Sequence, residues 1–163
     1  MPLTSKLSPS RLYRAMKVGI AGVVALLAAH LLRLPQAYWA AISAFVVMGG
    51  DVAATVRASR DRLIGTALGA MIGAIFFLLW GDHWWSFGLA ATSTVLLCAT
   101  FDLEQSYRLA CVTVAIVMLI QGAGSPWVIA LHRFLEVALG ILVALAISAL
   151  PPRVVVPSAQ PRS

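Results

Sequence analysis

Charged residues are scarce in this chain of 163 residues, since only 11% of them are Asp, Glu, Lys or Arg. A soluble domain has about 25% charged and roughly 45–50% apolar residues, whereas 61% of this chain is hydrophobic. So few charges do not cover a water-facing surface, and we expect the lipid bilayer to be the solvent. Acidic residues are especially few, six against twelve basic ones, and the net charge is +6.

The chain also lacks the residue groupings that enzymes and metal sites need. Its two cysteines, Cys98 and Cys111, stand inside apolar runs without disulfide or metal spacing. No cluster of histidines and carboxylates has metal spacing, and no Ser/His/Asp set is evident. We therefore expect no enzyme, no metal and no cofactor. The basic residues stand at the ends of apolar segments, which also argues against a nucleic-acid partner.

Six apolar segments are present, separated by charged or glycine-rich residues. A helix needs about 20 residues to cross the ~30 Å hydrocarbon core. The segments cover residues 11–32, 35–50, 52–80, 84–101, 103–121 and 126–150. Pro35 and Pro126 stand where the first turn of a helix tolerates proline. Asp102 with Gln105 has the pattern of a capping box that would open the fifth helix.

The basic residues predict the orientation of these segments. If residues 1–10 are a cytoplasmic N-terminal segment, every Lys and Arg except Arg33 and Arg133 lies on the cytoplasmic side. Six crossings return the proline-rich residues 151–163, which we expect to be a disordered tail, to the same side. No cleavable signal peptide is evident. We expect a multi-pass protein of the bacterial inner membrane with both termini in the cytoplasm.

An internal repeat is the most informative feature of the chain. Residues 61–74, DRLIGTALGAMIGA, resemble residues 132–145, HRFLEVALGILVAL, so that Arg62 matches Arg133 and Gly69 matches Gly140. The expected fold is all-α, a six-helix transmembrane domain over residues 11–150. Its two three-helix repeats, about 11–80 and 84–150, would be inverted because an odd number of crossings turns the second copy over.

Small residues recur every fourth position in both copies, at Gly65, Gly69 and Gly73 and again at Gly140 and Ala144. Such seams allow close helix contacts in membranes. Two interpretations stay open. The seams serve general helix packing, or both meet at one central interface related by the internal symmetry.

Glu136 is the most telling ionisable residue. It shares a helical face with Gly140 and Ala144, so its carboxylate is expected to point into the protein. His132, which changes charge near neutral pH, and Arg133 precede it by four and three residues. Ionisable groups at membrane depth mark a pathway or an internal pair. Either Glu136 forms a structural pair with Arg133 or His132, or Glu136 and His132 form a proton-coupling or gating site.

Arg62 and Arg133 are candidate substrate-binding cations. Inverted repeats would place them near opposite mouths of the protein, where they would attract an anion. The alternative for Arg62 is a cytoplasmic anchor. The second and fifth segments, the middle helices of the two repeats, are short, which is typical of transporter binding sites. Tyr38 and Trp39, at the start of the second segment, would stack on an aromatic cargo or anchor the helix at the membrane interface.

These residues carry a resemblance to a known family. Tyr38 and Trp39, then the polar stretch 51–60, then Arg62 and the Gly65–Thr66 helix with Gly69, resemble the aromatic acid exporter family, also called fusaric-acid-resistance-like proteins. Arg133, Glu136 and Gly140 fit the sixth helix of that family. The resemblance covers about residues 10–150.

The resemblance implies a six-helix membrane unit that exports organic, especially aromatic, carboxylate anions. Larger members carry a second six-helix unit and soluble domains, which are not expected here. Six short helices leave little room for a path, so two copies are expected to form a homodimer in the membrane lipid. The leading hypothesis is a homodimeric exporter of organic anions. The alternatives are a passive anion channel and a structural or accessory membrane subunit without transport of its own.

Overall fold

The computed structural model describes residues 9–103, 105–120 and 125–150. These residues form helices and connecting turns, with no strand among them. The helices are α1 (Pro9–Leu31), α2 (Tyr38–Val47), α3 (Val52–Trp80), α4 (Trp84–Thr100), α5 (Tyr107–Leu119) and α6 (Pro126–Ser148). α1, α3 and α6 are long and apolar enough to cross a membrane, whereas α2, α4 and α5 are shorter apolar helices. The chain is therefore all-α, as expected.

Each expected segment coincides with one helix, but some of the predicted ends are wrong. Pro126 is the first residue of α6, as expected. Pro35 does not open α2, because the backbone stays in turns until Tyr38. The glycine-containing residues 122–124, which follow the fifth segment and which we expect to end its helix, lie outside the described residues, as does the expected tail 151–163.

The expected capping box at Asp102 is also wrong. Asp102 has φ 52°, a left-handed conformation, and the Leu103 N–H donates to the Cys98 carbonyl at 2.8 Å. This is the arrangement that terminates a helix, so Asp102 ends α4 and α5 begins only at Tyr107. Arg33 ends α1 in the same way, with φ 54° and a bond of 3.0 Å from the Leu34 N–H to the Ala29 carbonyl.

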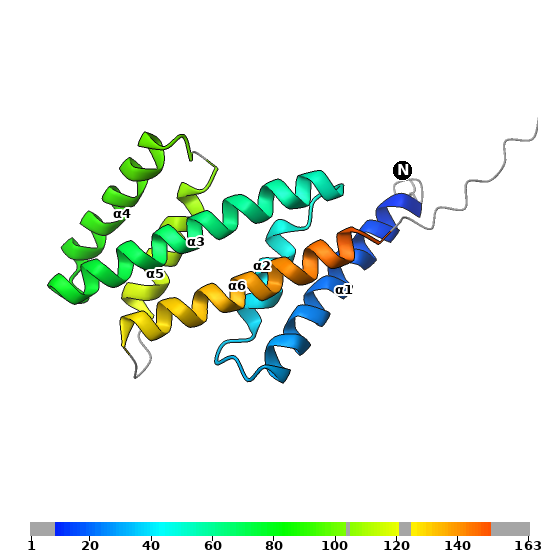
Figure 1. The fold of residues 1–163 in the computed structure, drawn as a ribbon, viewed down its shortest axis with the longest axis horizontal. Helices are drawn as coiled ribbons and strands as arrows, with labels where there is room; N and C mark the ends of the chain where they lie inside the picture. The colour runs from blue at the N-terminus through cyan, green and yellow to red at the C-terminus, as the bar shows by residue number, and fades with distance from the viewer. Residues whose placement is uncertain (1–8, 104, 121–124, 151–163) are drawn as a thin grey trace, which may run out of the picture.

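α3 and α6 cross the middle of the molecule side by side and run in opposite directions (Figure 1). α1 and α2 pack against α6, while α4 and α5 pack against α3. The core on the α1 side contains Ala21, Ala25 and Ala29, which stand four residues apart and are fully buried. Leu27 and Leu31 of the same helix are exposed. This face of α1 thus buries small residues, while large apolar residues of the helix point outward, as expected of a lipid-facing surface.

The glycine seams pack on the middle helices. A Cβ at Gly69 of α3 would collide with the Ala110 carbonyl of α5, and a Cβ at Gly140 of α6 would collide with the Ala40 carbonyl of α2. The interpretation that both seams meet at one central interface is therefore wrong. Each seam instead contacts the middle helix of the opposite expected repeat. Ala144 continues the second seam and is fully buried among residues of α1 and α2.

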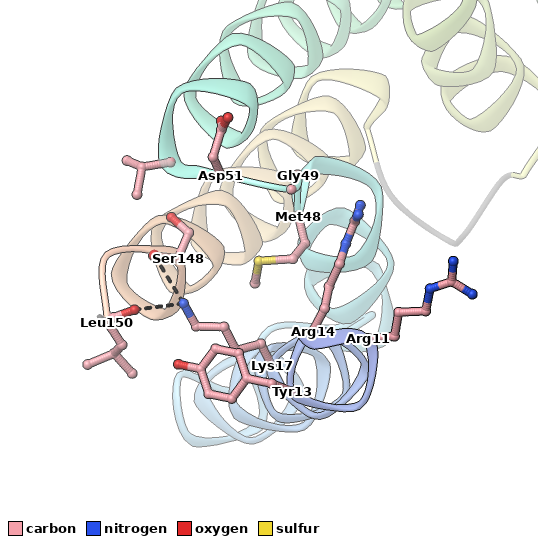
Figure 2. A pocket seen from close by; sticks show the side chains of 11 residues that line it. Arg11, Tyr13, Arg14, Lys17, Met48, Gly49, Asp51, Ser148 and Leu150 are labelled. Atoms are coloured by element: carbon pink, nitrogen blue, oxygen red, sulfur yellow. Dashed lines mark hydrogen bonds between the residues drawn. The ribbon is translucent and has the colours of Figure 1, made fainter. Parts of the chain in front are cut away.

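One end of the bundle gathers the start of α1, the start of α3 and the end of α6. The Lys17 ammonium of α1 donates to the Ser148 and Leu150 carbonyls at the end of α6, at 3.2 and 2.8 Å (Figure 2). α2 must therefore return the chain from the end of α1 to the start of α3.

An aromatic contact lies where α3 meets α4. The ring centres of Trp80 and Trp85 are 6.3 Å apart.

Candidate functional site

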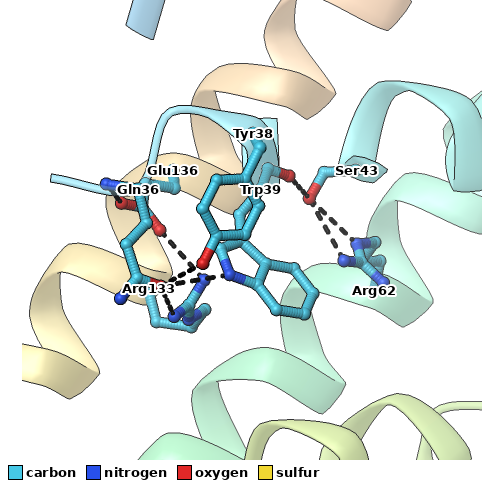
Figure 3. Close-up of polar contacts among 7 residues, drawn as sticks. All are labelled: Gln36, Tyr38, Trp39, Ser43, Arg62, Arg133 and Glu136. Carbon is cyan, nitrogen blue, oxygen red and sulfur yellow. Dashed lines mark hydrogen bonds and ion pairs between the residues drawn. The ribbon is translucent and has the colours of Figure 1, made fainter. Parts of the chain in front are cut away.

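Three charged side chains are buried around α2. Arg62 of α3 is 6% exposed, Arg133 of α6 is 3% exposed and Glu136 of α6 is 1% exposed. Figure 3 shows Arg133 and Glu136 beside the start of α2. Arg62 lies beside Ser43, farther along α2. The sequence predicted all three as site residues, and the structure brings them together. Neither guanidinium lies at an open mouth, because burial of this degree places both inside the bundle.

Arg133 and Glu136 form a compensated pair. Arg133 Nη1 lies 3.1 Å from Glu136 Oε2, and this is the one salt bridge within the part of the chain that the structure describes. The Gln36 backbone N–H donates to Glu136 Oε1 at 2.9 Å. The Gln36 side chain accepts a bond of 2.6 Å from Arg133 Nη2. The turn that precedes α2 is thereby tied to the middle of α6.

The Gln36 side chain also accepts hydrogen bonds from two aromatic residues. Its Oε1 accepts bonds from the Tyr38 hydroxyl at 3.0 Å and from Trp39 Nε1 at 3.2 Å. The Arg133 guanidinium lies 4.4 Å from the centre of the Trp39 ring, within the range of a cation–π interaction. Sequence reasoning missed Gln36, because an amide in a turn belongs to no periodic pattern or motif.

Arg62 has a different environment. Its Nε and Nη2 both donate to the Ser43 hydroxyl oxygen at 3.2 Å. Ser43 in turn donates to the Trp39 carbonyl at 2.7 Å. Among the described residues no carboxylate pairs with Arg62. Arg62 is therefore a buried cation whose partner is an uncharged hydroxyl.

The difference between the two arginines traces to one position of the repeat. Glu136 stands three residues after Arg133, and Gly65 stands three residues after Arg62. A Cβ at Gly65 would lie 2.7 Å from the carbonyl of Ser106, the residue that precedes α5. Close packing of α5 therefore fills the place that a counter-charge would need. The second copy carries its own anion, and the first does not.

The remaining predicted residues lie at the margin of this cluster. His132 is half-buried, and within the described residues no hydrogen bond joins it to Glu136. Tyr38 is half-exposed and Trp39 is partly buried at the start of α2. The Ser59 hydroxyl, one turn before Arg62, is buried without a hydrogen-bond partner. No group of three or more metal-ligating side chains occurs among the described residues.

All the residues of this cluster lie inside the match to a known family. The family model described as "Aromatic acid exporter family member 1" matches residues 11–150. The chain belongs to the aromatic acid exporter family. The resemblance carried by Arg62, Gly65 and Gly69 is thereby confirmed, and the family is one of membrane transporters rather than enzymes.

Curated relatives of this family member carry transporter or unassigned names. The chain is 33% identical over 144 residues to the "Uncharacterized transporter YdhK" of Escherichia coli (strain K12), an alignment that covers 78% of the chain and 21% of that protein. It is 28% identical over 143 residues to the "UPF0421 protein YgaE" of Bacillus subtilis (strain 168), which covers 86% of the chain and 40% of that protein. The chain thus spans less than half the length of these relatives. No solved structure matches it.

Proposed function

We propose that this chain is a membrane unit that exports organic, especially aromatic, carboxylate anions, and that Arg62 binds the carboxylate. The observation that carries the proposal is the buried guanidinium of Arg62, whose hydrogen bonds go to the uncharged Ser43 hydroxyl. An unpaired charge inside a membrane protein costs about 2.5–3.5 kcal/mol even on the mildest scales. Such a charge is retained where it has a function.

A carboxylate suits the unfilled part of Arg62. A guanidinium offers its donors as a planar fork that matches the two oxygens of a carboxylate. In the second repeat the Glu136 carboxylate already meets Arg133, through one contact of 3.1 Å between Nη1 and Oε2. We propose that the cargo supplies in the first repeat the negative charge that Glu136 supplies in the second. The name of the family, which refers to aromatic acids, agrees with this class of cargo.

We propose a separate role for the Arg133 cluster. Arg133 is neutralised by Glu136 and stacks on Trp39, and the Trp39 carbonyl orients the Ser43 hydroxyl that contacts Arg62. Arg133, Tyr38 and Trp39 would therefore receive the aromatic part of the cargo. Protonation of Glu136, with His132 beside it, would weaken the ties to Arg133 and to the turn before α2, and so couple or gate transport.

The proposal includes six crossings in two inverted repeats. Exchanging α1, α2 and α3 for α4, α5 and α6 maps every packed helix pair onto a packed pair, for example α2–α6 onto α5–α3, and the central α3–α6 pair onto itself. Each buried residue of α2 has a buried counterpart in α5 at a spacing of 70, namely Ala40, Ser43, Ala44 and Val47 with Ala110, Thr113, Val114 and Val117. These correspondences support the inverted arrangement.

The short middle helices support a transporter in particular. α2 has ten residues, so it is about 15 Å long and covers half of the ~30 Å hydrocarbon core. At least one of the turns at its ends would therefore lie at membrane depth, where irregular backbone is tolerated only inside the protein. Short or broken helices of this kind form the binding sites of many transporters. We further propose a homodimer in the inner membrane with both termini in the cytoplasm.

Uptake into proteoliposomes tests this function. We expect the wild-type protein to exchange radiolabelled benzoate, to transport succinate less well, and to accelerate benzoate uptake when a pH gradient is imposed. Glu136→Gln should remove the dependence on the gradient. A benzoate current that is independent of the pH gradient, in both the wild-type protein and Glu136→Gln, would indicate a channel. An absence of benzoate and succinate flux would contradict transport by this chain and favour an accessory subunit.

A further inference from the structure

A cleft of about 490 Å³ lies at the end of the bundle where α1 and α3 start and α6 ends. Pockets for small molecules usually measure about 300–1,000 Å³. Tyr13, Met48, Val52 and Leu150 supply apolar lining. The basic residues in the lining are Arg11, Arg14 and Lys17, and the acidic one is Asp51. The cleft therefore combines apolar walls with an excess of positive charge.

Two of these charged groups already have structural partners. Lys17 donates to two carbonyls at the end of α6. The Asp51 carboxylate accepts a bond of 2.6 Å from the Ala54 N–H and so caps α3. In Figure 2 the Arg11 side chain extends away from Met48 and Gly49. The remaining basic group of the lining is Arg14.

Arg14 is placed to meet a ligand. Its side chain reaches beside Met48 and Gly49 in Figure 2, and its Nη1 would lie 3.7 Å from a Cβ built on Gly50. Within the described residues Arg14 is exposed and donates no hydrogen bond. A guanidinium with open donors above apolar lining suits an anion that carries an apolar body.

We propose that this cleft is a loading site for amphipathic organic anions, in which Arg14 binds the carboxylate and Tyr13, Met48, Val52 and Leu150 contact the apolar part. This inference rests on the proposed function for the identity of the cargo. The positive-inside rule places this end of the bundle in the cytoplasm, the compartment from which an exporter collects its cargo. The cleft lies apart from the buried Arg62, so loading and translocation would use different cations.

Equilibrium binding of 2-naphthoate tests the site without requiring transport. The measurement uses the full chain in phosphatidylcholine nanodiscs, in an Arg62→Gln background so that the buried site does not contribute. We expect Arg14→Gln to raise the Kd at least about tenfold, the loss expected when a charge-assisted bond is removed. Arg57→Gln makes the same change in charge at an exposed position outside the cleft and should leave the Kd unchanged.

A second pair of variants separates binding from folding. Gly50→Glu would place a tethered carboxylate under Arg14 and should abolish naphthoate binding, whereas Gly50→Ala should not, because its Cβ would make only an ordinary contact. Unchanged Kd values in both Arg14→Gln and Gly50→Glu would overturn the proposal. Binding of phosphatidylglycerol that depends on Arg14, without such binding of naphthoate, would assign the cleft to a lipid headgroup and also overturn it.

Transport from the two faces distinguishes this inference from the proposed function. In proteoliposomes of defined orientation, Arg14→Gln should raise the KM for benzoate presented at the cytoplasmic face and leave the KM at the other face unchanged. Naphthoate binding through Arg14 without any benzoate flux would refute the proposed function and leave the cleft as a binding site. Flux that depends on Arg62 but not on Arg14 would refute the loading site alone.

Discussion

Arg62 and Ser43 form a two-to-one contact in which two guanidinium nitrogens donate to one hydroxyl oxygen, each at 3.2 Å. The proton of Ser43 goes to the Trp39 carbonyl, so the lone pairs of the hydroxyl face Arg62. A neutral acceptor satisfies hydrogen bonds but does not balance charge. Arg62 is held in place by α2, and no carboxylate of the described residues balances its charge.

Removal of the Ser43 hydroxyl should show how far Arg62 depends on this acceptor. Ser43→Ala leaves two donors of a buried guanidinium without an acceptor, which typically costs about 1–3 kcal/mol. We expect a lower melting temperature in detergent and a larger rise on addition of benzoate than in the wild-type protein. Thr92→Ala, which removes an exposed hydroxyl on α4, is the control and should change neither value. An equal benzoate response in Ser43→Ala and wild type would argue against an anion at Arg62.

The Arg133–Glu136 pair should behave as a unit. Removing one member of a buried pair leaves the other charge uncompensated and costs about 3–5 kcal/mol. We therefore expect Arg133→Gln to lower stability strongly, and Arg133→Gln/Glu136→Gln to recover most of the loss. The free energies of unfolding, measured by titration with denaturing detergent, form a double-mutant cycle. Additive losses in that cycle would contradict a coupled pair.

The glycine seam on α3 should be intolerant of side chains. Gly69→Ala forces a methyl group into the Ala110 carbonyl, and overpacking of this kind costs about 1–3 kcal/mol. Gly88→Ala is the matched control, because no atom lies within 4 Å of a Cβ at that position. Melting temperatures of the two purified variants give the comparison. Equal melting temperatures would show that α3 and α5 do not approach closely at Gly69.

The inverted arrangement makes a prediction about two exposed turns. Arg33 ends α1 and Asp102 ends α4, and both have positive φ. If α4–α6 repeat α1–α3 upside down, these residues lie on opposite sides of the membrane. Arg33→Cys and Asp102→Cys, each in a Cys98→Ala/Cys111→Ala background, should react with an impermeant maleimide from opposite faces. Labelling of both from one face would exclude six crossings in inverted repeats.

The sequence predicts the helical segments well because apolar length and charged boundaries follow directly from bilayer thickness. It predicts burial of Glu136 because that residue shares a face with Gly140. The starts of α2 and α5 were missed, since turn conformation and not periodicity determines where they begin. Gln36 was missed for the same reason, because its role depends on contacts with α6, 100 residues away.

The sequence also could not separate the two arginines. Arg62 and Arg133 occupy equivalent positions of the repeat, and the sequence alone treats both as substrate-binding cations. Only the packing of Ser106 against Gly65 shows that the first copy has no space for its own counter-charge. The sequence likewise does not show which helix each glycine seam contacts, because a row of small residues does not specify its partner.

Benzoate exchange by Arg62→Gln in proteoliposomes, with Arg57→Gln as the control for charge, tests whether Arg62 binds the cargo. Loss of one partner of a buried charge interaction costs about 2–5 kcal/mol, so kcat/KM should fall about thirtyfold or more in Arg62→Gln. Its melting temperature should not fall, because an uncompensated charge has been removed. Arg57→Gln should transport as the wild type does. Benzoate exchange by Arg62→Gln at the rate of Arg57→Gln would contradict carboxylate binding by Arg62.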